Sequence, residues 1–138
     1  MDPNLEAHLR DIYASTETIA VVGATPNPDK PGNFIPRYLQ SHGYRIVPVT
    51  PFHADVLGES TYAALSDVDV PVDVVDVFRP AAEAPEIVRE AISLGAKVVW
   101  LQLGIVSEEA AAIGRRAGIT MIMDRCMGAT HRELGLGR

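Results

Sequence analysis

The chain is built around Ile19-Ala20-Val21-Val22-Gly23-Ala24-Thr25-Pro26-Asn27-Pro28-Asp29-Lys30-Pro31-Gly32-Asn33. An apolar run typical of a buried strand enters a turn-rich loop with one lysine, and a helical pattern follows over residues 34–40. A strand that meets a helix start through such a loop directs backbone N–H groups and the positive end of the helix dipole at one place. We therefore predict that this loop holds the phosphate of a cofactor.

The bulk composition is that of one globular domain over residues 1–138, with 47% apolar and 22% charged residues. No apolar run is long enough to cross a bilayer, and the acidic N-terminus does not resemble a secretory signal. A net charge of −6 argues against nucleic-acid and anionic-membrane partners. The single cysteine, Cys126, allows no internal disulfide and favours a cytoplasmic location. Oligomerisation is left open.

Hydrophobic periodicity and turn residues predict an alternation of helices and strands. The expected strands are Thr18–Val22, 45–50, 72–78, 97–101 and 119–123. The expected helices are Pro3–Ala14, one capped by Asn33, a short one at 61–65, one that starts near Pro85, one capped by Ser107, and a short one at 130–134. Residues 52–60 are expected to be irregular. Strands that alternate with helices indicate an α/β, Rossmann-like, doubly wound parallel sheet with helices on both faces.

Ligands of such sheets lie at the carboxyl ends of the strands, beside the first strand. Five stretches meet there: 23–33, 50–53, 78–80, 102–105 and 124–127. A nicotinamide dinucleotide would need the pattern G-x-G-x-x-G and an acidic residue after the second strand. The loop supplies only Gly23 at those positions, and the second strand ends in Val49-Thr50-Pro51. A Walker phosphate loop is also absent from the sequence.

Five motifs in one order carry a resemblance that covers roughly the whole chain. They are IAVVGAT-x-x-P-x-K-x-G, YLQSHGYRIVPVTP, DVVDVFRP, VVWLQLGI and DRCMGATHREL. This order resembles the small stand-alone CoA-binding domain family and, more distantly, the N-terminal domain of succinyl-CoA synthetase α subunits. The resemblance implies a Rossmann-type domain that binds coenzyme A through its ADP and pyrophosphate parts.

Carried over by motif, the resemblance implies that the first loop holds the phosphates, through Gly23, Ala24, Thr25, Lys30 and Asn33. The second loop contributes Thr50 and Pro51, although Thr50 stands where the family more often has asparagine. The later strand ends would border the nucleotide, through Phe78, Arg79, Pro80, Leu101, Gln102 and Gly104. Simpler interpretations compete with these roles: Lys30 as a solvated loop charge, Arg79 as a surface arginine, and the first loop as a turn without ligand.

Cys126 follows the fifth strand, so that its thiol is expected near the ligand and could form a mixed disulfide with the CoA thiol. The alternative of a structural cysteine is favoured, because no histidine–carboxylate arrangement accompanies it. Trp100 is expected in the core, and Asp67, Asp69 and Asp73 as solvated turn or strand-entry residues. The histidines show no metal-ligand spacing, so no metal is assigned.

The leading hypothesis is a CoA-binding module without catalysis of its own, with free CoA, an acyl-CoA or CoA disulfide as the ligand. Synthetase α subunits carry their phosphorylated histidine in a second domain, and this chain ends before any such domain, so ligase activity by itself is not expected. One alternative is an NAD(P)-dependent oxidoreductase with an atypical phosphate loop. Another is a regulatory or partner-binding domain whose pocket is blocked by Phe52 or Phe78.

Overall fold

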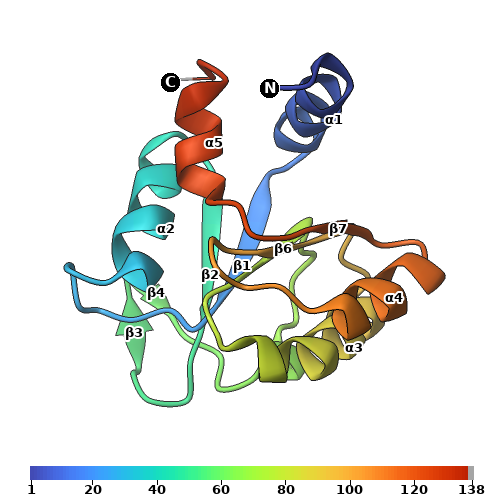
Figure 1. Ribbon diagram of the computed structural model, residues 1–138. Coiled ribbons are helices and arrows are strands. Elements are labelled where there is room, and N and C mark those ends of the chain that lie inside the picture. The colour runs from blue at the N-terminus through green and yellow to red at the C-terminus, as the bar shows by residue number, and fades with distance from the viewer. Residues whose placement is uncertain (137–138) are drawn as a thin grey trace.

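A computed structural model describes residues 1–136 and contains a five-stranded parallel sheet (Figure 1). The strand order is β2-β1-β5-β6-β7. The strands are β1 (Thr18–Val22), β2 (Arg45–Val49), β5 (Val74–Val77), β6 (Val98–Leu101) and β7 (Thr120–Ile122). The chain moves outward from β1 to β2 and then returns to the other side of β1 with β5, so the topological switch point lies between β1 and β5.

Helices cover both faces of the sheet (Figure 1). One face packs against α1 (Pro3–Ala14), α2 (Pro31–Ser41) and α5 (Met127–Glu133), around Leu9, Leu39 and Trp100. The other packs against α3 (Ala84–Leu94) and α4 (Glu108–Arg116), around Val88 and Ala111. Burial on both faces explains why the strands are nearly continuous apolar runs. The predicted doubly wound α/β fold is confirmed, as is the place of Trp100 in the core.

Several local predictions are corrected by the structure. Residues 52–60 contain a small antiparallel ribbon, β3 (Asp55–Val56) with β4 (Glu59–Ser60). The helix expected at 61–65 is wrong, because Tyr62 exchanges backbone hydrogen bonds with the end of β2. A single 3₁₀ turn, η1 (Leu65–Asp67), follows it, and a second, η2 (Ala81–Glu83), precedes α3.

Two helices begin earlier than the sequence predicts. α2 begins at Pro31, where a ring without an N–H suits the first helical turn, so Asn33 lies inside the helix and does not cap it. α5 begins at Met127, because the Cys126 sulfur accepts a hydrogen bond from the backbone N–H of Ala129 at 3.4 Å.

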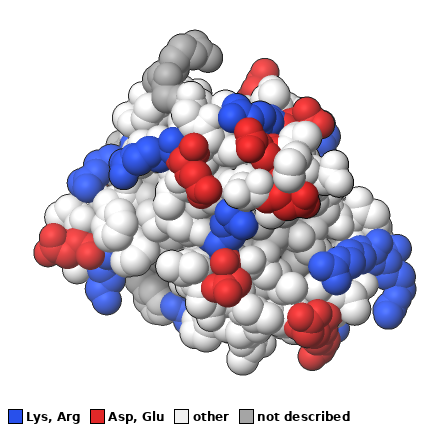
Figure 2. Space-filling model, turned by 45° about the horizontal axis from the view of Figure 1, so that its top comes forward, with Lys and Arg blue, Asp and Glu red and all other residues white. Residues whose placement is uncertain are grey.

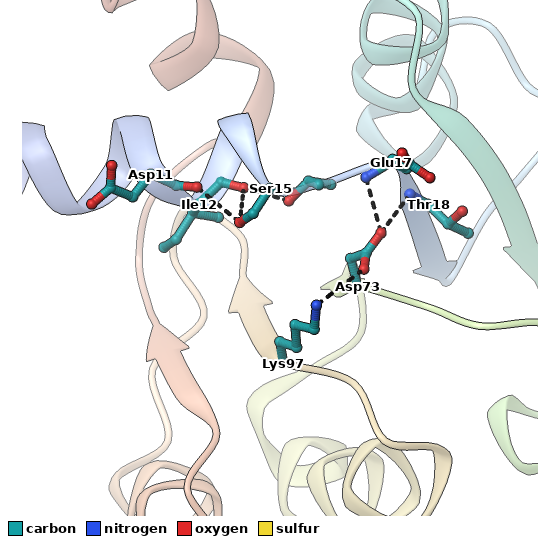
Figure 3. Close-up of polar contacts among 8 residues, drawn as sticks. Asp11, Ile12, Ser15, Glu17, Thr18, Asp73 and Lys97 are labelled. Atoms are coloured by element: carbon teal, nitrogen blue, oxygen red, sulfur yellow. Dashed lines mark hydrogen bonds and ion pairs between the residues drawn. The ribbon is translucent and has the colours of Figure 1, made fainter.

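The Asp73 side chain forms hydrogen bonds at the amino edge of the sheet, which is the edge where the parallel strands begin (Figure 3). Its carboxylate accepts hydrogen bonds from the backbone N–H groups of Glu17 and Thr18 at 2.9 and 3.0 Å. Lys97 lies 3.9 Å from the same carboxylate. Asp73 directly precedes β5, as expected of a strand-entry residue, but its carboxylate is bonded within the protein and ties the start of β1 to the start of β5.

The surface carries both signs of charge. On the face drawn in Figure 2, lysines and arginines lie among aspartates and glutamates. Among residues 1–136, no helix combines the length and apolar character needed to cross a bilayer.

Candidate functional site

A cavity of about 1120 Å³ opens at the carboxyl ends of β1, β2, β5 and β6, where the strand order predicts the ligand. It is large enough for an extended nucleotide cofactor. Most of the residues that the sequence singles out line it: Gly23, Ala24, Thr25, Lys30, Thr50, Pro51, Phe78, Arg79, Gln102 and Cys126.

Close backbone contacts fix the first loop. Gly23 has φ +93°, and a Cβ on it would lie 2.9 Å from the carbonyl oxygen of Phe78 at the end of β5. A Cβ on Gly32 would lie 2.5 Å from the carbonyl oxygen of Gly23. Side chains larger than hydrogen therefore cannot be placed at either position without moving backbone. These contacts hold the end of β1, the end of β5 and the start of α2 together at the cavity.

Asn33 supports the loop from behind. Its side-chain amide donates a hydrogen bond to the carbonyl oxygen of Thr25 at 2.9 Å, and the residue is only 5% exposed. The backbone N–H of Thr25 in turn contacts the carbonyl oxygen of Gly32 at 3.4 Å. Asn33 does not line the cavity. In this structure it positions the loop.

The two cationic side chains at the cavity are in different states. Lys30 is the exposed N-cap residue of α2, and it forms no ion pair within residues 1–136. Arg79 donates two hydrogen bonds to Glu83, at 3.0 and 2.7 Å. This pairing raises the pKa of Arg79 and lowers the pKa of Glu83, which also lines the cavity.

A buried carboxyl group lies beneath the cavity. Asp76, inside β5, is fully buried, and the side-chain amide of Gln102 donates a hydrogen bond to it. Burial raises the pKa of Asp76 to about 7, and the Gln102 hydrogen bond lowers it by less. Asp76 Oδ2 and Gln102 Oε1 have no hydrogen-bond partner among the described residues. Sequence reasoning gave Asp76 no role, although an acid within an apolar strand was a signal.

Some predicted residues lie elsewhere. Leu101 is buried in the core on the α3 and α4 face, and Pro80 does not line the cavity. Gly104 also lies outside the lining; its N–H donates to the Asp124 carboxylate at 2.7 Å. Conversely, the sequence missed the walls contributed by helices and the segment before η1. These include Phe34, Ile35, Ala63, Ala64, Leu65, Glu83, Ile87, Glu90 and Ala129.

Metal binding, or a histidine that activates Cys126, would depend on how the His, Cys, Asp and Glu side chains lie in the part of the chain that the structure describes. Within residues 1–136, no three His, Cys, Asp or Glu side chains are placed to hold a metal ion. The histidine nearest in sequence to Cys126 is His131, which is 2% exposed and whose Nδ1 contacts the Tyr38 hydroxyl at 2.8 Å. Burial, and then the charge of His42, lower the pKa of His131. This histidine packs between α2 and α5.

A buried parallel sheet, a tight glycine loop and the start of a helix meet at one cavity, which defines an α/β domain of the nucleotide-binding kind. The chain belongs to the CoA-binding domain family, because a family model described as "CoA binding domain" matches residues 17–132. The predicted family is therefore confirmed.

Relatives of similar length support this assignment. The uncharacterized protein YneT of Bacillus subtilis is 35% identical over 126 residues, which cover 91% of this chain and 93% of YneT. A hypothetical protein from Pyrococcus horikoshii has a solved structure that matches with a TM-score of 0.92 at 37% identity. That match covers 96% of this chain and 92% of the other.

A larger enzyme contains a similar region. The ADP-forming acetate–CoA ligase I of Archaeoglobus fulgidus is 25% identical over 130 residues. The match covers 87% of this chain but only 19% of the ligase. The chain thus corresponds to about one fifth of that enzyme.

Proposed function

We propose that the protein binds coenzyme A in the cavity at the carboxyl edge, through the ADP and pyrophosphate parts of the ligand. The observation that carries this proposal is the contact of Gly23, Gly32 and Phe78 backbone at the start of α2, in a chain of the CoA-binding domain family. The start of α2 lies in the cavity wall, so the positive end of the helix dipole lies at the cavity, which suits the phosphates.

In this proposal each wall of the cavity binds a different part of CoA. The loop of Gly23, Ala24 and Thr25 holds the pyrophosphate, and Lys30 supplies a positive charge that no carboxylate within residues 1–136 neutralises. Arg79 is a second phosphate partner, for which the ligand competes with Glu83. Thr50, Pro51, Phe78 and Gln102 border the rest of the ligand. Asn33 contributes indirectly, through Thr25.

The same arrangement favours binding without catalysis. Among the described residues, the cavity lining contains one thiol and one histidine, His53, but no hydrogen bond joins a nucleophile to a base there. The vestigial-pocket alternative required Phe52 or Phe78 to block the cavity. Phe52 is 78% exposed, and Phe78 forms part of a wall of the open cavity.

Isothermal calorimetry tests the proposal with protein stripped of carried-over ligand. CoA, acetyl-CoA, NAD and ATP are titrated separately, and CoA is expected to bind more tightly than NAD or ATP. Binding of NAD or ATP as tight as that of CoA would contradict the proposal. Binding of NADH that CoA does not displace would instead support the oxidoreductase alternative.

A further inference from the structure

Cys126 lies in the wall of the cavity. A cysteine with a purely structural role would not need to lie there. The thiol is half-buried, and the N–H of Ala129, another lining residue, donates to its sulfur. Hydrogen bonds hold the two residues before Cys126 in place. Trp100 Nε1 donates to the carbonyl oxygen of Arg125 at 2.7 Å, and Gly104 N–H donates to Asp124. These bonds fasten the segment before Cys126 to both sides of Gln102, at the end of β6.

A second observation at this place indicates a ligand. Gln102 lines the same cavity, is only 4% exposed, and has a carbonyl oxygen without a partner among residues 1–136. An unsatisfied buried acceptor costs roughly 1–3 kcal/mol unless a donor reaches it. The pantetheine arm of CoA carries amide N–H groups a few bonds from its terminal sulfur. A shift of the Gln102 side chain towards the cavity would let this buried oxygen accept an amide N–H of the arm, and the sulfur of the arm would then lie towards the wall that contains Cys126.

We propose that Cys126 is a covalent attachment site for coenzyme A, which it captures from CoA disulfide by thiol–disulfide exchange. This inference rests on the proposed function, because the ADP part must first be held by the loop of Gly23 and Lys30. Binding then places the disulfide beside Cys126, so that the reaction proceeds within the complex.

The exchange needs no other reactant. The Cys126 thiol loses its proton to solvent, and its thiolate attacks one sulfur of CoA disulfide. The sulfur–sulfur bond of CoA disulfide breaks as a new bond forms between Cys126 and one CoA, and the second CoA leaves as a thiolate that takes up a proton. Residues 1–138 contain no second cysteine, so this chain supplies no thiol of its own to resolve the adduct. The adduct persists until an external thiol reduces it.

Intact-protein mass spectrometry tests this inference. Reduced protein is incubated with CoA disulfide or, in parallel, with oxidised glutathione at the same concentration. Glutathione disulfide lacks the ADP part, so we expect the CoA adduct to form at least about tenfold faster. Lys30→Ala should slow only the reaction with CoA disulfide, and excess acetyl-CoA should slow it as a competitor. Equal rates with the two disulfides, or no adduct with CoA disulfide, would overturn the proposal.

Cys126→Ser separates this inference from the proposed function. Serine retains the ability to cap α5, so the variant should fold, bind reduced CoA in calorimetry and form no adduct. If wild type and Cys126→Ser both bind CoA but wild type forms no selective adduct, the covalent site is refuted and the proposed function stands. Failure of both proteins to bind CoA refutes the proposed function as well. An adduct on Cys126→Ser would show that attachment occurs elsewhere and would also refute the inference.

Discussion

The amino edge of the sheet, where the parallel strands begin, differs from the carboxyl edge, where they end, in how polar side chains are paired. At the amino edge, Asp73 accepts two backbone hydrogen bonds and lies near Lys97, so its polar groups are satisfied within the protein (Figure 3). At the carboxyl edge, Lys30 has no ion-pair partner within the described residues, and Gln102 and Asp76 each retain a buried oxygen without a partner. The second cavity, of about 740 Å³ near the amino edge, contains none of these atoms.

This difference separates a structural edge from a binding edge. Polar groups that serve stability are paired with each other, whereas groups that serve a ligand are left for the ligand to complete. A cavity alone does not make the distinction, since both edges have one. The distinction comes from the unpaired cation Lys30 and from Gln102, which lines the cavity and keeps an oxygen without a partner among residues 1–136.

Gly23→Ala should abolish the loop geometry. Alanine at φ +93° is strained, and its Cβ would lie 2.9 Å from the Phe78 carbonyl oxygen. We expect a loss of more than about 3 kcal/mol in unfolding free energy, and at least a tenfold loss of CoA affinity. Gly95→Ala is the matched control, because its φ is +85° but nothing lies within 4 Å of the added Cβ. Thermal unfolding and calorimetry compare the two; equal effects would contradict the role of close contact.

Asp76→Asn should change how stability depends on pH. In wild type the carboxyl group has a pKa of about 7 when folded and an ordinary value of 3.8. Between these values the folded protein holds one more proton than the unfolded chain, so stability falls as pH rises and levels off above about pH 7. The decrease is on the order of 4 kcal/mol. Urea unfolding across this range should show the decrease in wild type and its loss in the variant. A variant with the same slope as wild type would refute the assignment.

Lys30→Ala should weaken CoA binding by about 1–2 kcal/mol, which is the value of one charge-assisted phosphate contact. The chain has only one other lysine, Lys97, which lies at the amino edge. Lys97→Ala removes the same charge and should leave CoA affinity unchanged. Calorimetry at one ionic strength compares them. Equal losses would mean that the overall charge of the protein matters and the position of Lys30 does not.

Glu83→Gln should strengthen CoA binding by about two- to fivefold, because it releases Arg79 for a phosphate and removes a negative charge from the cavity. The control is Glu86→Gln. Glu86 pairs with Arg89 at 3.4 Å on the same helix and does not line the cavity. The gain should be specific to Glu83. Unchanged or weaker binding by Glu83→Gln would remove Arg79 from the phosphate site.

The sequence predicted those parts of the molecule that depend on local chemistry. The apolar runs, the cap at Ser107 and the glycine after α3 marked the elements closely, because each acts within a few residues. The bridge of Tyr62 to Val49 was missed, because it depends on an element distant in the sequence. The walls contributed by α2 and α3 were missed for a similar reason, since the angle at which a helix crosses the sheet is set by packing.

The candidate site followed the same rule. Gly23 was predicted, since a glycine after a strand has a local signature, whereas Gly32 depends on a contact with the Gly23 carbonyl that only the folded loop creates. The Asp76–Gln102 pair needed the register of β5 against β6, in which Asp76 lies opposite Trp100. The alternation of side chains along a strand predicts which face of the sheet each one occupies. The register between two strands depends on tertiary packing, so the sequence did not predict it.

NMR measurement of backbone amide shifts, as CoA is added to isotope-labelled protein, tests most directly whether CoA binds at the carboxyl edge. We predict the largest changes at residues 23–33 and 50–53 and at Gln102, with little change at Glu17, Thr18, Asp73 and Lys97. Changes centred on the amino edge, or no saturable change at residues 23–33, would contradict the assignment of the carboxyl edge as the CoA site.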